Sequence, residues 1–178
     1  MEKEIVILSD LWGTSHSHWI RHFRKGISSQ YNIKFYDSCE LGNIDVANLD
    51  EKIRHEQFIN FGIQNAVNKL IELEKESKIY IGCSVGGVIA WKAGLAGLRI
   101  QELVTISSTR LRKETDKPNC PVRMYFGEFD KYKPDRDWLI TINCTCEIIE
   151  GGNHDIYNDE LVVSEILEKL NLGWKDQK

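Results

Sequence analysis

Short runs dominated by apolar residues alternate with longer amphipathic stretches along the chain. Four of these runs are Ile5 to Leu8, Ile79 to Ile81, Leu103 to Ile106 and Val122 to Phe126. Runs of this kind are typical of strands that are covered on both faces, and the stretches between them have the length and spacing of helices. The alternation predicts βαβ units built around a parallel sheet.

Two further strands are predicted at Asn32 to Tyr36 and at Cys144 to Ile149. A helix from Trp19 to Ser29, with Ser15 and Ser17 as capping candidates, precedes the first of them, and an amphipathic helix from Asp159 to Leu170 closes the chain. The pattern therefore predicts an α/β protein: a three-layer α/β/α sandwich with a mostly parallel sheet of about six strands.

Between Leu49 and Lys75 the apolar positions recur at helical spacing, which predicts a long helix or a helix pair broken near Gly62. A buried helix is predicted around Val88 to Trp91. The stretch from Ser107 to Pro121 is polar and contains two prolines, so it is expected to be a loop. No linker, repeat or low-complexity segment interrupts the pattern, and residues 1–178 are expected to form one domain.

Composition narrows the classes of function. The chain has 178 residues, a formal net charge of −4 and 42% hydrophobic residues, as expected for an ordinary acidic globular protein. The acidic balance argues against nucleic acid as a partner. No apolar stretch approaches the roughly 20 residues that span a bilayer, and the N-terminal residues Met1 to Glu4 lack the basic region of a signal peptide. A cytoplasmic protein without a membrane partner is expected.

The cysteines give no sign of a metal site or of a disulfide framework. There are five, an odd number, at Cys39, Cys83, Cys120, Cys144 and Cys146, which favours reduced thiols. Cys144 and Cys146 form a C-x-C pair, but no second pair follows at zinc spacing, so two side chains on one face of a strand are the better interpretation. No metal and no cofactor is expected.

A nucleophile motif follows the third predicted strand directly. The residues Gly82-Cys83-Ser84-Val85-Gly86 fit G-x-S-x-G, with a strand before and a helix after. A sharp strand-to-helix turn lifts the serine hydroxyl clear of the sheet, and the glycines are needed where a Cβ would collide with neighbouring backbone. The alternative is a turn of small residues that only allows close packing of helix and sheet. The strand and helix on either side favour a catalytic Ser84.

A serine hydroxyl needs a base, and the base needs an orienting group. Asp130 follows the fifth strand and His154 follows the sixth, so both are expected at the same sheet edge as Ser84. Asp135 is the rival acid, because Asp130 could instead cap the helix that begins near it. Asp155 is next to His154 in sequence and therefore badly placed to reach its ring.

With Ser84, Asp130 and His154 in this order, the sequence resembles the α/β-hydrolase family, whose triad runs serine, acid, histidine. The resemblance extends from the first strand to the last helix. It implies that Ser84 is the nucleophile, that His154 is the general base and then the acid, and that Asp130 holds the imidazole tautomer.

The resemblance also implies an oxyanion hole made of two backbone N–H groups. One is that of Val85, which follows the nucleophile. The other is assigned to Leu11, with Trp12 as the alternate, in the loop after the first strand. In the family that loop commonly begins with His-Gly, whereas here it begins with Ser9-Asp10. An acidic side chain there would repel the oxyanion unless it turned away or were paired.

Larger members of the family insert a lid after the fourth of these strands, but here Ser107 to Pro121 is too short for one. The expected site is open, with Trp12 as an apolar wall that contacts the substrate. The basic residues nearby are explained by a solvated loop, with a preference for anionic substrates as the alternative: Arg110, Arg112 and Lys113.

The function predicted from this pattern is that of a serine hydrolase that cleaves a small carboxylic ester or thioester. The alternative is a catalytically inactive binding protein of the same fold, suggested by Asp10. A flavodoxin-like phosphate or flavin binder is disfavoured, because Gly13-Thr14-Ser15 only partly matches a phosphate-binding loop.

Overall fold

The computed structural model describes residues 3–47 and 50–173. Six strands form one parallel sheet in the order β2-β1-β3-β4-β5-β6. The predicted fold class is confirmed, and every strand pairing is parallel. The strands are β1 (Lys3–Leu8), β2 (Tyr31–Tyr36), β3 (Lys78–Cys83), β4 (Ile100–Ile106), β5 (Val122–Gly127) and β6 (Cys146–Ile149).

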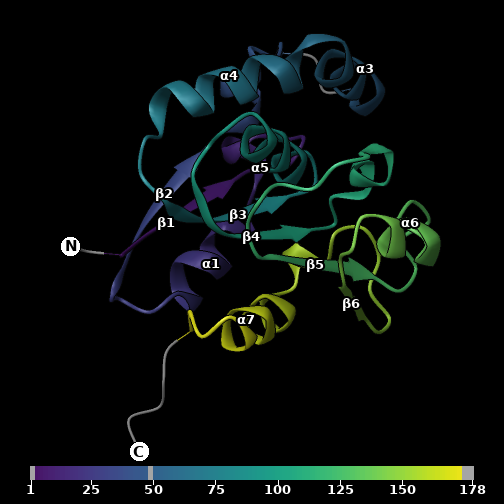
Figure 1. The fold of residues 1–178 in the computed structure, drawn as a ribbon. Coiled ribbons are helices and arrows are strands. Elements are labelled where there is room, and N and C mark those ends of the chain that lie inside the picture. The colour runs from purple at the N-terminus through teal and green to yellow at the C-terminus, as the bar shows by residue number, and fades with distance from the viewer. Residues whose placement is uncertain (1–2, 48–49, 174–178) are drawn as a thin grey trace, which may run out of the picture.

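Helices cover both faces of the sheet. Helices α1 and α7 lie together on one face, and α3, α4 and α5 lie on the other (Figure 1). The α-helices are α1 (Ile20–Gly26), α2 (Ser38–Gly42), α3 (Glu51–Gln57), α4 (Ile63–Leu73), α5 (Val85–Leu95), α6 (Arg136–Thr141) and α7 (Glu160–Lys169). Short helical turns are η1 (Thr14–His16), η2 (Phe58–Gly62), η3 (Thr109–Lys113) and η4 (Ile156–Asn158).

The core has two halves because successive side chains of a strand point to opposite faces. In β1, Val6 and Leu8 join the cluster beneath α4 and α5, whereas Ile5 and Ile7 join the cluster beneath α1 and α7. All four side chains are fully buried. This is the burial predicted for a continuously apolar central strand.

The long helical stretch contains the irregularity predicted near Gly62. Helices α3 and α4 are joined without a gap by the π-helical turn η2, which ends at Gly62. A Cβ on Gly62 would lie 2.5 Å from the Ile44 side chain, which would have to shift to admit a larger residue there. The predicted helix start at Leu49 lies outside the described residues, as do Met1 and Glu2.

Several predicted boundaries were wrong at their ends. The first helix is shorter than predicted, because the chain becomes extended at Ile27 and pairs there with Gly173. Strand β6 begins at Cys146, so Cys144 lies before it and the two do not share a strand. The sequence pattern did not predict α2, whose five residues are too few to show a helical period. Among the described residues, no helix is both long and apolar enough to cross a membrane.

Candidate active site

Ser84 stands at the sharp turn between β3 and α5. Its backbone has φ 50° and ψ −117°, a conformation that is rare for a residue with a side chain. The Ser84 amide donates to the carbonyl of Ile106 on β4 at 2.8 Å, which ties the turn to the neighbouring strand. Ser84 directly follows the last residue of β3, at the carboxyl edge of the sheet, and is half-buried.

The glycines of the motif allow the close backbone approach that was predicted. A Cβ on Gly82 would lie 2.3 Å from the Gly87 amide nitrogen. A Cβ on Gly86 would lie 2.5 Å from the carbonyl oxygen of Ser9. The second contact brings the start of α5 directly against the end of β1, where the predicted oxyanion loop begins.

Ser84, His154 and Asp130 form one hydrogen-bonded chain. The Ser84 Oγ lies 3.2 Å from His154 Nε2, and His154 Nδ1 lies 2.7 Å from Asp130 Oδ2. The Asp130 side chain is 1% exposed and that of His154 is 44% exposed. Asp130 Oδ1 also accepts the amide of Tyr132 at 3.0 Å, so both carboxylate oxygens are held. The three residues singled out from the sequence lie together.

The loops that carry Asp130 and His154 are joined to each other by main-chain contacts. The Phe129 amide donates to Gly152 O at 2.8 Å. A Cβ on Gly127 would lie 2.1 Å from the carbonyl oxygen of Asn153. The distance between the acid and the histidine is therefore fixed by backbone as well as by their own hydrogen bond.

The rival acids have other contacts. Asp135 caps α6, where its side chain accepts the amide of Trp138 at 2.8 Å. The carbonyl of Asp155 accepts the amide of Asn158 at 2.8 Å within η4. Within the described part of the chain, neither carboxylate has a hydrogen bond to His154.

Cys83 is a nucleophilic side chain immediately before Ser84, but it is buried in the core. Its exposed fraction is 0%, and burial raises the pKa of its thiol well above the usual value. A thiol in such a setting stays protonated and is inert. All five cysteines are unpaired.

Asp10 turns away from the site and into the protein. Its Oδ1 accepts the amide of Trp12 at 3.0 Å and the hydroxyl of Ser17 at 3.1 Å, and its Oδ2 accepts Trp19 Nε1 at 3.1 Å. Burial raises the pKa of Asp10, and these hydrogen bonds oppose that rise. Ser17, a predicted helix cap, therefore contacts Asp10 instead of capping α1.

The hydrogen bond to Asp10 also distinguishes the two candidate oxyanion donors of this loop, the amides of Leu11 and Trp12. The amide of Trp12 is committed to the Asp10 carboxylate. Among the described residues, the amides of Leu11 and Val85 have no hydrogen-bond acceptor. These two backbone amides are thus left as donors for a ligand.

The fold was compared with solved structures, and the sequence with known proteins. No protein-family model and no curated protein matches the sequence. Mouse alpha/beta hydrolase domain-containing protein 10 matches the structure with a TM-score of 0.68 at 12% identity, over 94% of this chain and 88% of that one. A serine hydrolase homologue from Coxiella burnetii matches with a TM-score of 0.64 at 14% identity, over 96% and 85% of the two chains. XC6422 from Xanthomonas campestris, described as an a/b serine hydrolase without lid, matches with a TM-score of 0.58 at 14% identity, over 93% and 79%.

The chain has the α/β-hydrolase fold. The segment after β4, which the sequence predicts to be too short for a lid, contains the short turn η3. Arg112 of η3 donates to the carbonyls of Thr109 at 2.7 Å and Tyr132 at 3.3 Å, which ties the segment to the loop of Asp130. The described segment is thus a short strap beside the candidate site.

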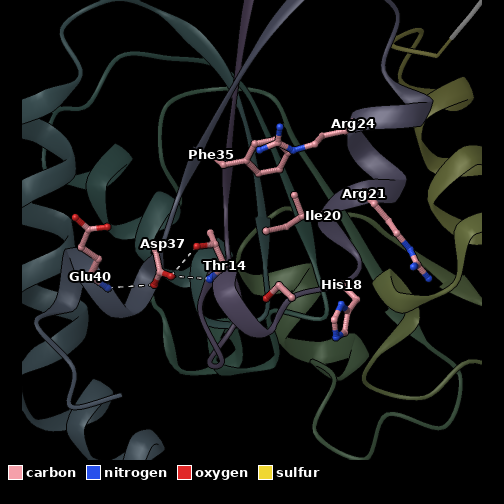
Figure 2. Close-up of a pocket in the computed structure, with 9 residues that line it drawn as sticks. Thr14, His18, Ile20, Arg21, Arg24, Phe35, Asp37 and Glu40 are labelled. Carbon is pink, nitrogen blue, oxygen red and sulfur yellow. Dashed lines mark hydrogen bonds between the residues drawn. The ribbon is translucent and has the colours of Figure 1, made fainter. Parts of the chain in front are cut away.

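A groove of about 470 Å³ lies between α1 and α2 (Figure 2). His18, Arg21 and Arg24 line its α1 side, and the Arg24 guanidinium lies 4.6 Å from the centre of the Phe35 ring. The opposite side carries Asp37, which also caps α2. Ser84, His154 and Asp130 do not line this groove.

Arg54 is the residue beside the site that sequence reasoning missed. It is 0% exposed, its guanidinium lies 5.1 Å from the centre of the Trp12 ring, and it donates to Val46 O at 2.7 Å. An arginine on an amphipathic helix is ordinarily assigned to the solvated face. Its neighbours in the sequence, which include Lys52 and Glu56, give no signal that would have distinguished it.

Proposed function

We propose that this protein is a serine hydrolase that cleaves small carboxylic esters or thioesters through an acyl-enzyme. The observation that carries the proposal is the continuous hydrogen-bonded chain from Ser84 Oγ through His154 to Asp130, at 3.2 and 2.7 Å. This constellation is recognised by geometry and by the role of each group.

The reaction begins with His154 Nε2 taking the proton from Ser84 Oγ as the oxygen attacks the substrate carbonyl. The tetrahedral intermediate then expels the alkoxide or thiolate, which receives that proton from His154. A water molecule attacks the acyl-enzyme in the same way and releases the carboxylic acid and free Ser84. Asp130 keeps Nδ1 protonated and stabilises the imidazolium formed in each half of the reaction.

The negative oxygen of the intermediate is assigned to the amides of Val85 and Leu11. Val85 is the first residue of α5, so the positive end of the helix dipole adds to its N–H. The Leu11 amide belongs to the loop after β1, which lies against the start of α5 through Gly86 and Ser9. The amide of Trp12 is the weaker candidate, because the Asp10 carboxylate already accepts it.

The substrate class rests on the open site and on its neighbours. The half-buried Trp12 provides an apolar wall for the acyl or alcohol group, and Arg54 holds its ring. Est1E from Butyrivibrio proteoclasticus, with ferulic acid bound, matches the fold with a TM-score of 0.61 at 12% identity over 95% of this chain and 90% of that one. This likeness supports a small ester of an organic acid.

A catalytically inactive binding protein is the second candidate function. It is suggested by Asp10, the acidic residue in the proposed oxyanion loop. The contacts of Asp10 weaken this argument, because the residue is only 4% exposed and its carboxylate accepts hydrogen bonds from Ser17 and Trp19 inside the protein. No described residue carries an observation that favours inactivity over hydrolysis.

The first test is intact mass spectrometry after treatment with a fluorophosphonate, which phosphonylates activated serines. The wild type should gain one adduct, Ser84→Ala should gain none, and Cys83→Ala should keep it as a control for the neighbouring nucleophile. An unmodified wild type, or an adduct retained in Ser84→Ala, would remove Ser84 from the role.

The second test separates reactivity from turnover. His154→Ala should abolish hydrolysis of a short-chain p-nitrophenyl ester while its circular dichroism spectrum and thermal midpoint stay close to those of the wild type. Turnover retained in this variant would discard the proposed base.

A further inference from the structure

The loop after β1 is a tight turn from Asp10 to Gly13, and two hydrogen bonds to Asp10 close it. The Gly13 amide donates to the Asp10 carbonyl at 3.3 Å, and the Trp12 amide donates to Asp10 Oδ1 at 3.0 Å. The second contact is an Asx turn, in which a side-chain oxygen takes the place of a backbone acceptor. The two bonds make Asp10 the residue that shapes this loop.

The carboxylate that closes the turn is itself anchored in the protein. Asp10 is 4% exposed, and its carboxylate accepts the Ser17 hydroxyl at 3.1 Å and Trp19 Nε1 at 3.1 Å. The Tyr157 side chain of η4 is a further polar neighbour, which lowers the pKa of Asp10. The position of Asp10 Oδ1, and with it that of the Trp12 amide, is therefore set by residues from two other segments.

The peptide between Leu11 and Trp12 is held at both ends. Its N–H belongs to Trp12 and points to Asp10 Oδ1, while its carbonyl, on Leu11, accepts the Cys39 thiol at 3.2 Å. Burial raises the pKa of Cys39 to about 12, so this thiol remains a donor at neutral pH. A peptide held on both sides cannot rotate, which fixes the backbone on the C-terminal side of Leu11.

We infer that Asp10 is a positioning residue that prepares the oxyanion hole: it removes the Trp12 amide from the site and leaves the Leu11 amide as the donor. This inference rests on the proposed serine hydrolase function and deepens it. Fixed donors aimed at the developing charge need no reorganisation during the reaction, which is where such sites gain most of their rate. An acidic residue in the oxyanion loop is thus part of the machinery instead of a defect.

The kinetic test compares Asp10→Ala, Asp10→Asn and Asp135→Ala on a short-chain p-nitrophenyl ester. Asp10→Ala removes both carboxylate oxygens, including the acceptor of the Trp12 amide. Because a lost oxyanion donor costs roughly 100-fold to 1000-fold in kcat, kcat should fall by about 30-fold or more, while KM stays within about threefold. Asparagine keeps one oxygen for the Trp12 amide and should restore kcat to within about fivefold of the wild type.

Asp135→Ala is the matched control, because Asp135 also accepts a backbone amide, that of Trp138, and lies outside the proposed machinery. It should lower the thermal midpoint and leave kcat within about twofold. The inference is overturned if Asp10→Ala keeps kcat within threefold of the wild type, or if Asp10→Asn is as impaired as Asp10→Ala.

A second measurement needs no variant and so does not depend on Asp10→Ala folding. In the ¹⁵N-labelled wild type, the Trp12 amide should exchange with solvent at least about tenfold more slowly than the Leu11 amide. After fluorophosphonate treatment, the phosphonyl oxygen bound to Ser84 occupies the place of the oxyanion. The Leu11 and Val85 amide protons should then move downfield while that of Trp12 stays in place. A downfield shift of Trp12 in place of Leu11 would reverse the assignment.

The two proposals fail in different ways. A wild type that is neither labelled at Ser84 nor able to turn over the ester contradicts the serine hydrolase itself. A wild type that is labelled and active, with an Asp10→Ala variant equally active, contradicts only the role of Asp10.

Discussion

Gly82 and Gly87 approach each other so closely across the turn of Ser84 that a Cβ on Gly82 would lie 2.3 Å from the Gly87 amide nitrogen. No flexible side chain is available to give way, because the colliding atoms are all backbone. The position of the proposed nucleophile therefore depends on the absence of a single methyl group.

Gly82→Ala should lower the free energy of unfolding by about 2–3 kcal/mol, the upper part of the range for overpacking a rigid core. It should also remove fluorophosphonate labelling of Ser84, because the turn must open to admit the methyl group. Urea denaturation and intact mass measure the two effects.

Gly173→Ala is the matched control for Gly82→Ala. Its added Cβ would lie 3.6 Å from its nearest neighbour, the Glu168 side chain, which is an ordinary contact. This variant should keep its labelling and change the free energy of unfolding by less than about 0.5 kcal/mol. Equal effects of the two substitutions would contradict the steric account of the turn.

The acid of the hydrogen-bonded chain can be distinguished from its rival by substitution. Asp130→Asn keeps the shape of the side chain but no longer holds Nδ1 of His154 as a donor, so kcat should fall by about 10³-fold to 10⁴-fold. Asp135→Asn, at the N-cap of α6, should leave kcat within about twofold. A loss in Asp135→Asn and none in Asp130→Asn would exchange their roles.

The proximity of Ser84, Asp130 and His154 could be predicted from the sequence, because the topology of a parallel sheet determines where each residue lies. Each residue follows a strand, and the carboxyl ends of parallel strands meet at one edge of the sheet. The order of these three residues along the chain then leaves few arrangements. The sheet was equally predictable, because its central strands are short, continuously apolar runs.

The environment of Asp10 and Arg54 could not be predicted, because side-chain direction decides it. Asp10 turns inward to Trp19, nine residues further along the chain, and this contact exists only after α1 has packed. Arg54 is buried, with its guanidinium over the Trp12 ring and bonded to Val46 O, and a periodic pattern describes neither contact. Charged residues whose partners lie on other elements leave no local signal.

Asp10 gives the stability of the protein a definite pH dependence. Burial raises its pKa above the ordinary 3.8, so between that value and the folded-state pKa the native protein binds more protons than the unfolded chain. Stability due to this group is full below about pH 3.8 and declines as the pH rises through the folded-state pKa. The difference in unfolding free energy between the wild type and Asp10→Asn should therefore fall with rising pH. A difference that rises with pH would contradict the burial of this carboxylate.

Glu74 should show the opposite pH dependence. It is 3% exposed and accepts Lys34 Nζ at 2.8 Å, Tyr36 OH at 2.6 Å and Lys78 Nζ at 2.6 Å. Burial alone would raise its pKa, but these donors outweigh burial and lower the pKa below 4.5. Its stabilisation is present above pH 4.5 and is lost as the pH falls through the folded-state value.

Glu74→Gln should cost about 2 kcal/mol at pH 7, less than a fully buried pair because Lys34 is 44% exposed. The difference from the wild type should shrink as the pH is lowered from 5 to 3, since protonation removes the same charge from the wild type. Glu72→Gln is the control: its pair with Lys69 is exposed, so the cost should stay below about 0.5 kcal/mol throughout. Equal costs for both variants, or a Glu74 difference that grows in acid, would show that the lysines do not hold this carboxylate in its charged form.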